Sequence, residues 1–291
     1  MIFLRAAFES SGSPSWIMRA IRAQAFDRRH GFDLELVLGG DVGDRRAQAT
    51  QHVLAQGRAD LIDADWLSIA RSQDTDAPLK AIFPYGKIVG ALVAASASGI
   101  QNLADLRGRR VGVIRASDKN WFVARAACRK RHGFDPQSDA QVAEAFSKTT
   151  LLRWLEAGEV EVAALPWHLA PRLTASGKFR LLCDVLDLLD ELGAPCVPTT
   201  FFATRPEFAA SHPALIAGFI GAYRDAVAFL RADENAWREA AAQPGDDSAV
   251  LAALRAAWLR RICDERPENA THRLDDFFER LSRDLLVPEH A

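Results

Sequence analysis

The feature that most constrains the fold is a regular alternation of short apolar runs with amphipathic helical patterns. Residues 2–8 form an apolar run, residues 15–30 have a helical pattern, and residues 32–38 alternate apolar and polar side chains as a strand does. Further apolar runs follow at residues 60–64 and 79–84, each after another helical pattern. This β-α-β-α-β order predicts a parallel sheet with right-handed crossovers.

The same alternation restarts in the middle of the chain. Apolar runs at residues 88–95, 110–114 and 160–165 are separated by turns and helical patterns. Beyond residue 204 the remaining patterns are helical. The sequence therefore predicts two α/β lobes, with a helical C-terminal part that packs mainly on the first lobe.

The balance of charge narrows the classes of function. The chain of 291 residues carries 36 Lys and Arg side chains against 38 Asp and Glu, a formal net charge of -2. Nucleic-acid recognition needs a basic surface, so this balance argues against a nucleic-acid partner. Hydrophobic residues make up 49% and charged residues 25%, which is typical of a globular protein. No apolar run approaches the roughly 20 residues that cross a bilayer as a helix.

The four cysteines do not form a metal-binding pattern. Cys128, Cys183, Cys196 and Cys263 include no C-x-x-C pair and no His at ligand spacing, so zinc and iron–sulfur sites are not expected. Cys183 and Cys196 either pair across a loop or remain two separate buried thiols. The sequence implies no metal and no cofactor.

Six segments, taken in order, resemble the type II periplasmic solute-binding proteins. The most similar class binds nitrate, taurine, aliphatic sulfonates or thiamine pyrimidine precursors for ABC transporters. The segments are the strand that ends at the polar loop after Phe8, F-D-R-R-H-G-F-D-L-E-L-V from Phe26, G-R-A-D-L from Gly57, N-L-A-D-L-R-G-R-R-V-G-V from Asn102, L-E-A-G-E-V-E-V from Leu155, and E-F-A-A-S-H-P from Glu207. Together they cover nearly the whole chain.

The resemblance implies an α/β fold of the two-lobed, type II periplasmic-binding-protein kind, with a hinge and a cleft between the lobes. Two chain crossings are expected near residues 85–89 and 198–200. Lobe 1 is then discontinuous and contains residues 1–87 and 200–291, whereas lobe 2 contains residues 88–199.

Small ligands of such α/β proteins bind at the carboxyl ends of strands, close to the N-termini of helices. The candidate ligand-binding residues follow predicted strands in this way. They are Ser10, Ser11, Gly40, Asp63, Asp65, Trp66, Tyr85, Ser117, Asp118, Lys119, Asn120, Trp121, Trp167 and His168. No nucleophile–base arrangement is visible in the sequence, so no catalytic residue is assigned.

Several candidates also have a purely structural interpretation. Ser10 and Ser11 either contact a ligand or cap the following helix, and Gly40 either lies in the site or only turns the chain. Asp65 is expected mainly as a helix N-cap. Trp66 either lines the cleft or packs inside the lobe.

The aromatic candidates leave the same choice open. Tyr85, Trp167 and His168 lie at predicted strand ends, where aromatic rings favour a ligand with a planar or apolar portion. A single histidine is more often a hydrogen-bonded structural residue than a ligand contact. Tryptophans at strand ends equally serve packing.

The segment around Lys119 is the strongest candidate. It joins a predicted strand to a predicted helix, whose N-terminus favours anions through its free N–H groups and its dipole. A lysine opposes that dipole, so we expect Lys119 to pair either with an anionic ligand or with Asp118 or Asp63. Asp118 is expected to cap the helix, and Trp121 either lines the cleft or packs beneath it.

Three functions fit these observations. The leading hypothesis is a non-catalytic solute-binding component of an ABC importer that closes two lobes around a small, anionic ligand, of the sulfonate, nitrate or aromatic type. The alternative is a cytoplasmic enzyme on the same fold, of the lyase, decarboxylase, desulfinase or pyrimidine-precursor-synthase type. The desulfinase type uses a cysteine in the first loop, where this chain has Ser10 and Ser11. A third option is a ligand-sensing domain without a transporter.

The partners and the location follow from the leading hypothesis. We expect a small-molecule ligand, a membrane permease and a monomeric state. The resemblance implies a periplasmic location. The first residues are too short for a signal peptide and have the pattern of a strand, so the location is cytoplasmic if no signal precedes them.

Overall fold

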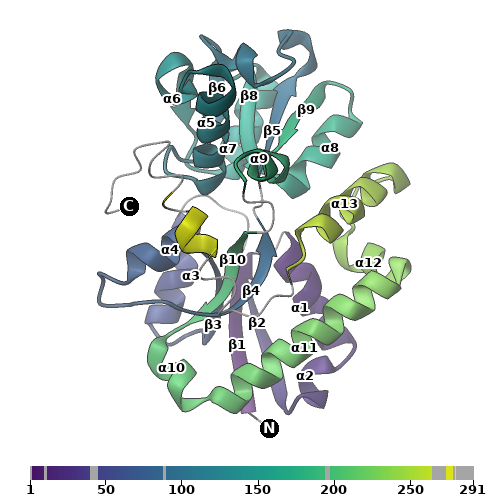
Figure 1. Ribbon diagram of the computed structural model, residues 1–291. Coiled ribbons are helices and arrows are strands. Elements are labelled where there is room, and N and C mark those ends of the chain that lie inside the picture. The colour runs from purple at the N-terminus through teal and green to yellow at the C-terminus, as the bar shows by residue number, and fades with distance from the viewer. Residues whose placement is uncertain are drawn as a thin grey trace. The chain divides into compact units, whose positions relative to one another are not determined.

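The chain forms two compact α/β units in a computed structural model (Figure 1). The described residues are 2–9, 12–39, 45–87, 90–193, 197–263, 273–277 and 279. The first unit takes the described residues up to Tyr85 and those from Thr200 to Cys263, and the second takes Gly86–Thr199. Residues 273–277 group with the second unit, so the assignment of all residues from 200 to 291 to lobe 1 stays a prediction.

The sheet of the first unit has the order β2-β1-β3-β10-β4. Its strands are β1 (Ile2–Glu9), β2 (Phe32–Gly39), β3 (Leu61–Asp65), β4 (Lys80–Lys87) and β10 (Pro198–Thr204). The first strand pairs in parallel with β2 and β3, but β10 runs antiparallel to β3. The predicted parallel pairing is confirmed for β1, β2 and β3, and the sheet is mixed because a strand from far along the chain is inserted beside β3.

The second unit repeats this plan. Its strands are β5 (Gly90–Ala95), β6 (Arg110–Val113), β7 (Gln141–Glu144), β8 (Val162–Pro166) and β9 (Phe179–Asp184), in the order β7-β6-β8-β5-β9. This order matches that of the first sheet: three neighbouring strands come first, the inserted strand is fourth, and one further strand follows it. The inserted strand of this sheet is β5, which runs antiparallel to β8 and β9.

Eight helices of the described chain belong to the first unit. They are α1 (Ser13–Ala23), α2 (Phe26–Arg29), α3 (Arg45–Ala55), α4 (Trp66–Ser72), α10 (Pro206–Ser211), α11 (Pro213–Ala232), α12 (Glu234–Ala241) and α13 (Ser248–Arg261). The single helix predicted over residues 15–30 is two helices, because Ala25 adopts a left-handed conformation with a φ of 51° and ends the first.

The long helix α11 has the length and apolar composition of a membrane-spanning segment, with a mean hydropathy of 1.3 over 18 residues. It packs, however, against α1, α2 and β2. Phe219 and Tyr223 on its buried face lie against Phe202 of β10, with ring centroids 5.0 and 5.1 Å apart. These contacts are those of a core helix.

A buried carboxylate joins three strands of the first unit. Asp60 lies just before β3 and is 4% exposed. Its two oxygens accept hydrogen bonds from the guanidinium of Arg5 on β1, at 2.9 and 2.6 Å. Arg205, just after β10, lies 3.7 Å from the same carboxylate. Asp60 is thus paired with two arginines, as a buried charge requires.

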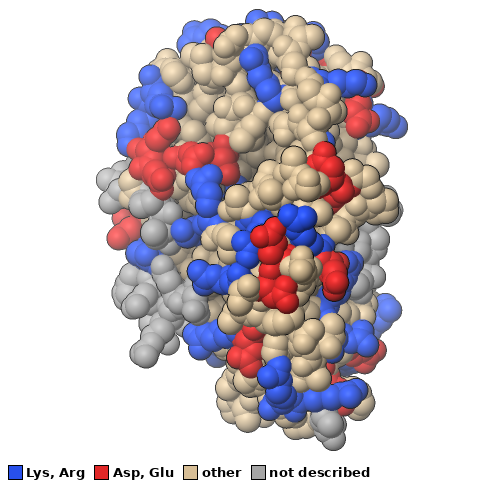
Figure 2. All heavy atoms as spheres, turned by 90° about the vertical axis from the view of Figure 1, so that its right-hand side faces the viewer, with Lys and Arg blue, Asp and Glu red and all other residues tan. Residues whose placement is uncertain are grey.

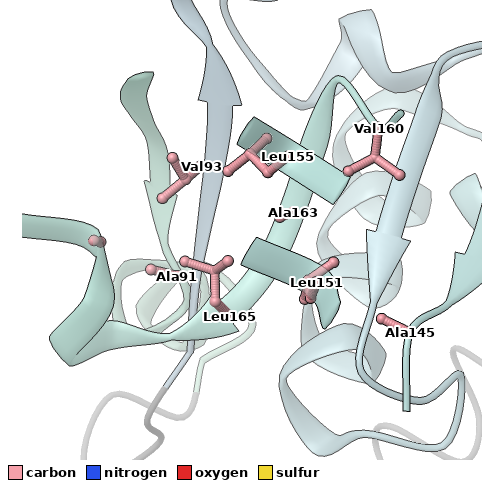
Figure 3. Close-up of a cluster of buried hydrophobic side chains, with 9 residues drawn as sticks. Ala91, Val93, Ala145, Leu151, Leu155, Val160, Ala163 and Leu165 are labelled. Carbon is pink, nitrogen blue, oxygen red and sulfur yellow. The ribbon is translucent and has the colours of Figure 1, made fainter. Parts of the chain in front are cut away.

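The second unit holds α5 (Lys119–His132), α6 (Pro136–Asp139), α7 (Lys148–Ala157), α8 (Ala170–Ala175) and α9 (Val185–Glu191), with short 3-10 turns at Ser96–Ser98, Leu103–Leu106 and Trp167–Leu169. Figure 3 shows one of its hydrophobic clusters, where Leu151 and Leu155 of α7 meet Val93, Ala163 and Leu165 of the sheet. The contact is close: a Cβ added to Gly112 of β6 would lie 2.5 Å from Leu151.

Candidate functional site

Four polar or aromatic residues gather at the carboxyl edge of the first sheet. Asp63 lies in the middle of β3 and Asp65 ends it, and Tyr85 lies near the end of β4. The antiparallel register pairs Thr200 with Asp65, which brings the start of β10 to the same edge. The sequence analysis missed Thr200 as a candidate, since it treated this segment only as a chain crossing.

Tyr85 is buried at this edge. Its ring stacks on Phe202 with centroids 4.4 Å apart, and its hydroxyl donates to Asp63 Oδ2 at 3.4 Å. Burial, and then the negative charge of Asp63, raise the pKa of Tyr85 well above its usual value. The phenol is therefore a neutral hydrogen-bonding group and not a general base.

The two residues that follow have structural roles. Asp65 caps α4 and accepts from the backbone N–H of Ser68 at 3.0 Å, as expected for an N-cap. Trp66 is only 7% exposed. Trp66 is therefore largely packed inside the unit, and its predicted ligand contact stays a prediction.

The N-terminus of α1 also lies at this edge, directly after β1. Its N-cap is Gly12, with a φ of 92°, and no side chain described in the structure caps it. The first turn contains no acidic residue. Its N–H groups and the helix dipole are therefore suited to an anion. Ser10, Ser11 and Gly40 lie outside the described residues, so their predicted contacts stay predictions.

In the second unit, the segment between β6 and α5 is closely hydrogen-bonded. Asp118 is the N-cap of α5, and its carboxylate accepts from the backbone N–H of Asn120 at 2.7 Å. The backbone N–H of Ala116 donates to Glu144 at 3.0 Å. Ser117 and Lys119 are half-buried here. Asp118 thus caps α5 as expected, and the protein's own carboxylate lies at the helix end beside Lys119.

Asn120 packs against the first residue of β5. A Cβ on Gly90 would lie 2.5 Å from the Asn120 side chain, so this position requires glycine. Asn120 is 7% exposed, and its Oδ1 is a buried acceptor with no partner within the described part of the chain. Buried acceptors without a partner are rare in folded proteins, and a water or a ligand usually donates a hydrogen bond to them.

Trp121 does not line a site. It is fully buried, and its indole N–H donates to Gln137 Oε1 at 2.6 Å. Of the two alternatives left open by the sequence, packing beneath the segment is the one that the structure shows. A ligand contact by Trp121 is not supported.

Trp167 and His168 form a 3-10 turn directly after β8. Both are buried, with their rings edge to face at 6.0 Å. The carbonyl of His168 accepts from Arg172 at 3.1 Å. Since Gly90 pairs with Pro166, this turn lies at the same edge of the sheet as Asn120. The direct ligand contacts predicted for the two rings stay predictions.

Two of the described thiols, those of Cys128 and Cys183, are poor nucleophiles. Cys128, Cys183 and Cys263 form no disulfide among the described residues. Burial raises the pKa of Cys128 to about 12 and that of Cys183 further, so both stay protonated at neutral pH. The Cys183–Cys196 pairing concerns Cys196, which lies outside the described residues. No group of three His, Cys, Asp or Glu side chains suited to a metal occurs in the described ranges.

The charged surface is mixed in sign. On the face shown in Figure 2, Lys and Arg side chains are interspersed with Asp and Glu. This view shows no broad basic surface of the kind that a nucleic-acid backbone requires.

Comparison with solved structures identifies the fold. The alkanesulfonate-binding protein SsuA from Xanthomonas axonopodis pv. citri, bound to MOPS, has a TM-score of 0.74 and 17% identity, over 100% of this chain and 96% of that chain. The aliphatic sulphonate binding protein SsuA from Escherichia coli has a TM-score of 0.71 and 18% identity, over 100% and 90%. The desulfurization enzyme DSZB has a TM-score of 0.65 and 16% identity, over 99% and 94%.

These matches confirm the predicted α/β periplasmic-binding-protein fold, with its two mixed sheets. No curated protein sequence matches the chain. The sequence profile described as "NMT1/THI5 like" matches residues 23–246, which is most of the chain. The protein therefore belongs to the NMT1/THI5-like family.

Proposed function

We propose that the protein is the solute-binding component of an ABC-type importer and binds a small organic anion, of which a sulfonate is the leading candidate. The likeness to two sulfonate-binding proteins over the full chain supports this proposal. In this function the ligand lies between two lobes that close by hinge motion, and a membrane permease is the partner. The proposal includes export to the periplasm and a monomeric state.

The observation that carries the proposal is the N-terminus of α1, within a fold shared with anion-binding proteins. Four other helices that follow a strand end are capped by a side chain, since Asp65 caps α4, Asp118 caps α5, Ser147 caps α7 and Asp184 caps α9, whereas α10 after β10 has no such cap. The N-cap of α1 is Gly12, without such a side chain. The positive end of this helix dipole is complementary to the oxygens of a sulfonate.

Titration calorimetry on the full chain tests this function. The panel is ethanesulfonate, nitrate, acetate and a neutral pyrimidine, each at low and at physiological salt. We expect one anion class to bind with one site per chain, and more weakly as salt rises. If no anion binds while the neutral compound does, the anion-binding function is wrong.

The second candidate is an enzyme on the same fold, because the desulfurization enzyme DSZB is also similar over nearly the full chain. The described thiols do not favour this candidate, since Cys128 and Cys263 are buried and the pKa of Cys128 is raised. Each bound compound should therefore be recovered unchanged after prolonged incubation. Steady conversion of any of them, followed by mass spectrometry, would establish the enzyme instead.

A further inference from the structure

Phe146 combines two unfavourable features in one residue. Its φ is 54°, in the left-handed region that a bulky side chain rarely adopts. Its ring is also 57% exposed to solvent. Ala25 is the other non-glycine residue in the described ranges with a positive φ, and its side chain is a single methyl group.

Packing within the second unit does not explain the choice of phenylalanine. The neighbouring Ala145 is buried in the cluster with Leu151 and Val160, as Figure 3 shows, whereas Phe146 is not part of that cluster. A glycine or an asparagine would make the same turn with less backbone strain and no exposed ring. The ring is therefore explained better by a contact outside this core.

The backbone fixes the position from which the ring projects. The N–H groups of Ala145 and Phe146 donate to the carbonyls of Val113 and Ile114, at 2.8 and 3.0 Å. Ser147 then caps α7 and accepts from the N–H of Thr150 at 2.9 Å. Each residue from 145 to 147 thus has a hydrogen bond that holds it.

The same contacts place Phe146 beside the segment that carries Lys119. Phe146 is hydrogen-bonded to Ile114, the first residue after β6. Glu144, two residues before Phe146, accepts from the N–H of Ala116. An exposed aromatic ring and a cationic segment are therefore neighbours at the carboxyl edge of one sheet.

We propose that Phe146 determines which ligand is preferred, by contacting the apolar tail of an anion whose charged group lies near Lys119. This inference rests on the proposed function and adds a ligand class to it. The expected ligand is an anion with an alkyl or aryl portion and not a bare inorganic anion. Strain of this kind is often found where a side chain has to be presented to a ligand.

Chain-length preference tests this proposal. The affinities of ethanesulfonate and octanesulfonate are measured by calorimetry for the wild type, Phe146→Ala, Phe146→Gly and Phe3→Ala. Phe3 is the matched control, because it is a 65% exposed phenylalanine at the amino end of β1. Both Phe146 variants should bind octanesulfonate about tenfold or more weakly than the wild type does. Their affinity for ethanesulfonate should stay within twofold of the wild-type value. Phe3→Ala should change neither affinity.

The melting temperature separates ligand contact from a structural role. Because glycine relieves the strain at this φ, Phe146→Gly should melt at the same temperature as the wild type or higher. A lower melting temperature with an unchanged chain-length preference would overturn the proposal. If the wild type binds both sulfonates and both Phe146 variants bind them with the wild-type affinities, this inference fails while the proposed function stands. If the wild type binds neither sulfonate, both are wrong for this ligand class.

Discussion

The carboxylate of Asp118 accepts a hydrogen bond of 2.7 Å from the backbone N–H of Asn120. This contact closes the N-terminus of α5 with an internal negative charge. An anion that approaches Lys119 therefore meets attraction from the ammonium group and repulsion from its neighbour in sequence.

Lys119→Ala should weaken the binding of an anionic ligand by about 1.5–3 kcal/mol, the range for a hydrogen bond to a charged group. Calorimetry with ethanesulfonate measures the change. Lys130→Ala is the control, because Lys130 lies on the same helix and its Nζ donates to the carbonyl of Glu191. An affinity of the Lys119 variant within twofold of the wild type rules out a direct contact.

Asp118→Asn and Asp118→Ala should differ in stability. Asparagine keeps the oxygen that caps α5, whereas alanine removes it and should lower the free energy of unfolding by about 1 kcal/mol. Both variants remove the negative charge, so both should bind ethanesulfonate about two- to fivefold more tightly. Urea denaturation and calorimetry provide the two measurements. If neither variant binds ethanesulfonate more tightly than the wild type, the charge of Asp118 does not act on the ligand.

Asp135 should govern part of the acid stability. It accepts from Arg125 at 2.9 and 2.7 Å and from Arg129 at 2.8 Å. Burial alone would raise the pKa of Asp135, but these hydrogen bonds prevail and lower it to about 2. Because this pKa lies below the unfolded value of about 3.9, the stabilisation is present above about pH 4 and is lost as the pH falls towards 2.

Asp135→Asn should therefore lower the free energy of unfolding at pH 7 by about 3 kcal/mol, since it leaves two half-buried arginines without their carboxylate. Its stability should also fall less than that of the wild type between pH 4 and pH 2. Asp76→Asn, in an exposed turn, is the control and should behave as the wild type. Parallel acid-unfolding curves for the wild type and the Asp135 variant would contradict this account.

The strand alternation was enough to predict two α/β lobes, but not the order of strands in the sheets. The local pattern around Phe32 specifies a strand, yet nothing near Pro198 indicates that β10 inserts between β3 and β4. Such pairing depends on contacts between residues far apart in sequence. The resemblance to a known family supplied the fold that the local patterns could not.

The candidate site was predicted less completely, for a related reason. A residue's place after a strand can be inferred from sequence, and Asp65 and Asp118 are N-caps as expected. The direction of a side chain cannot be inferred in this way, and Trp121 points into the core. Phe146 was missed because its left-handed backbone has no sequence signal when the residue is not glycine or asparagine.

Gly90 and Asn120 provide a test of the second unit's edge that does not depend on the ligand. Gly90→Ala would place a methyl group 2.5 Å from the Asn120 side chain. Because that side chain is buried, the clash should lower the free energy of unfolding by about 1–3 kcal/mol. In Gly90→Ala/Asn120→Gly the methyl group has room, because the Cβ of Asn120 is among the atoms it meets, so the double variant should recover most of this loss. Urea denaturation of both single variants and the double variant measures the coupling. If the two losses simply add, Asn120 is not what makes glycine necessary at position 90.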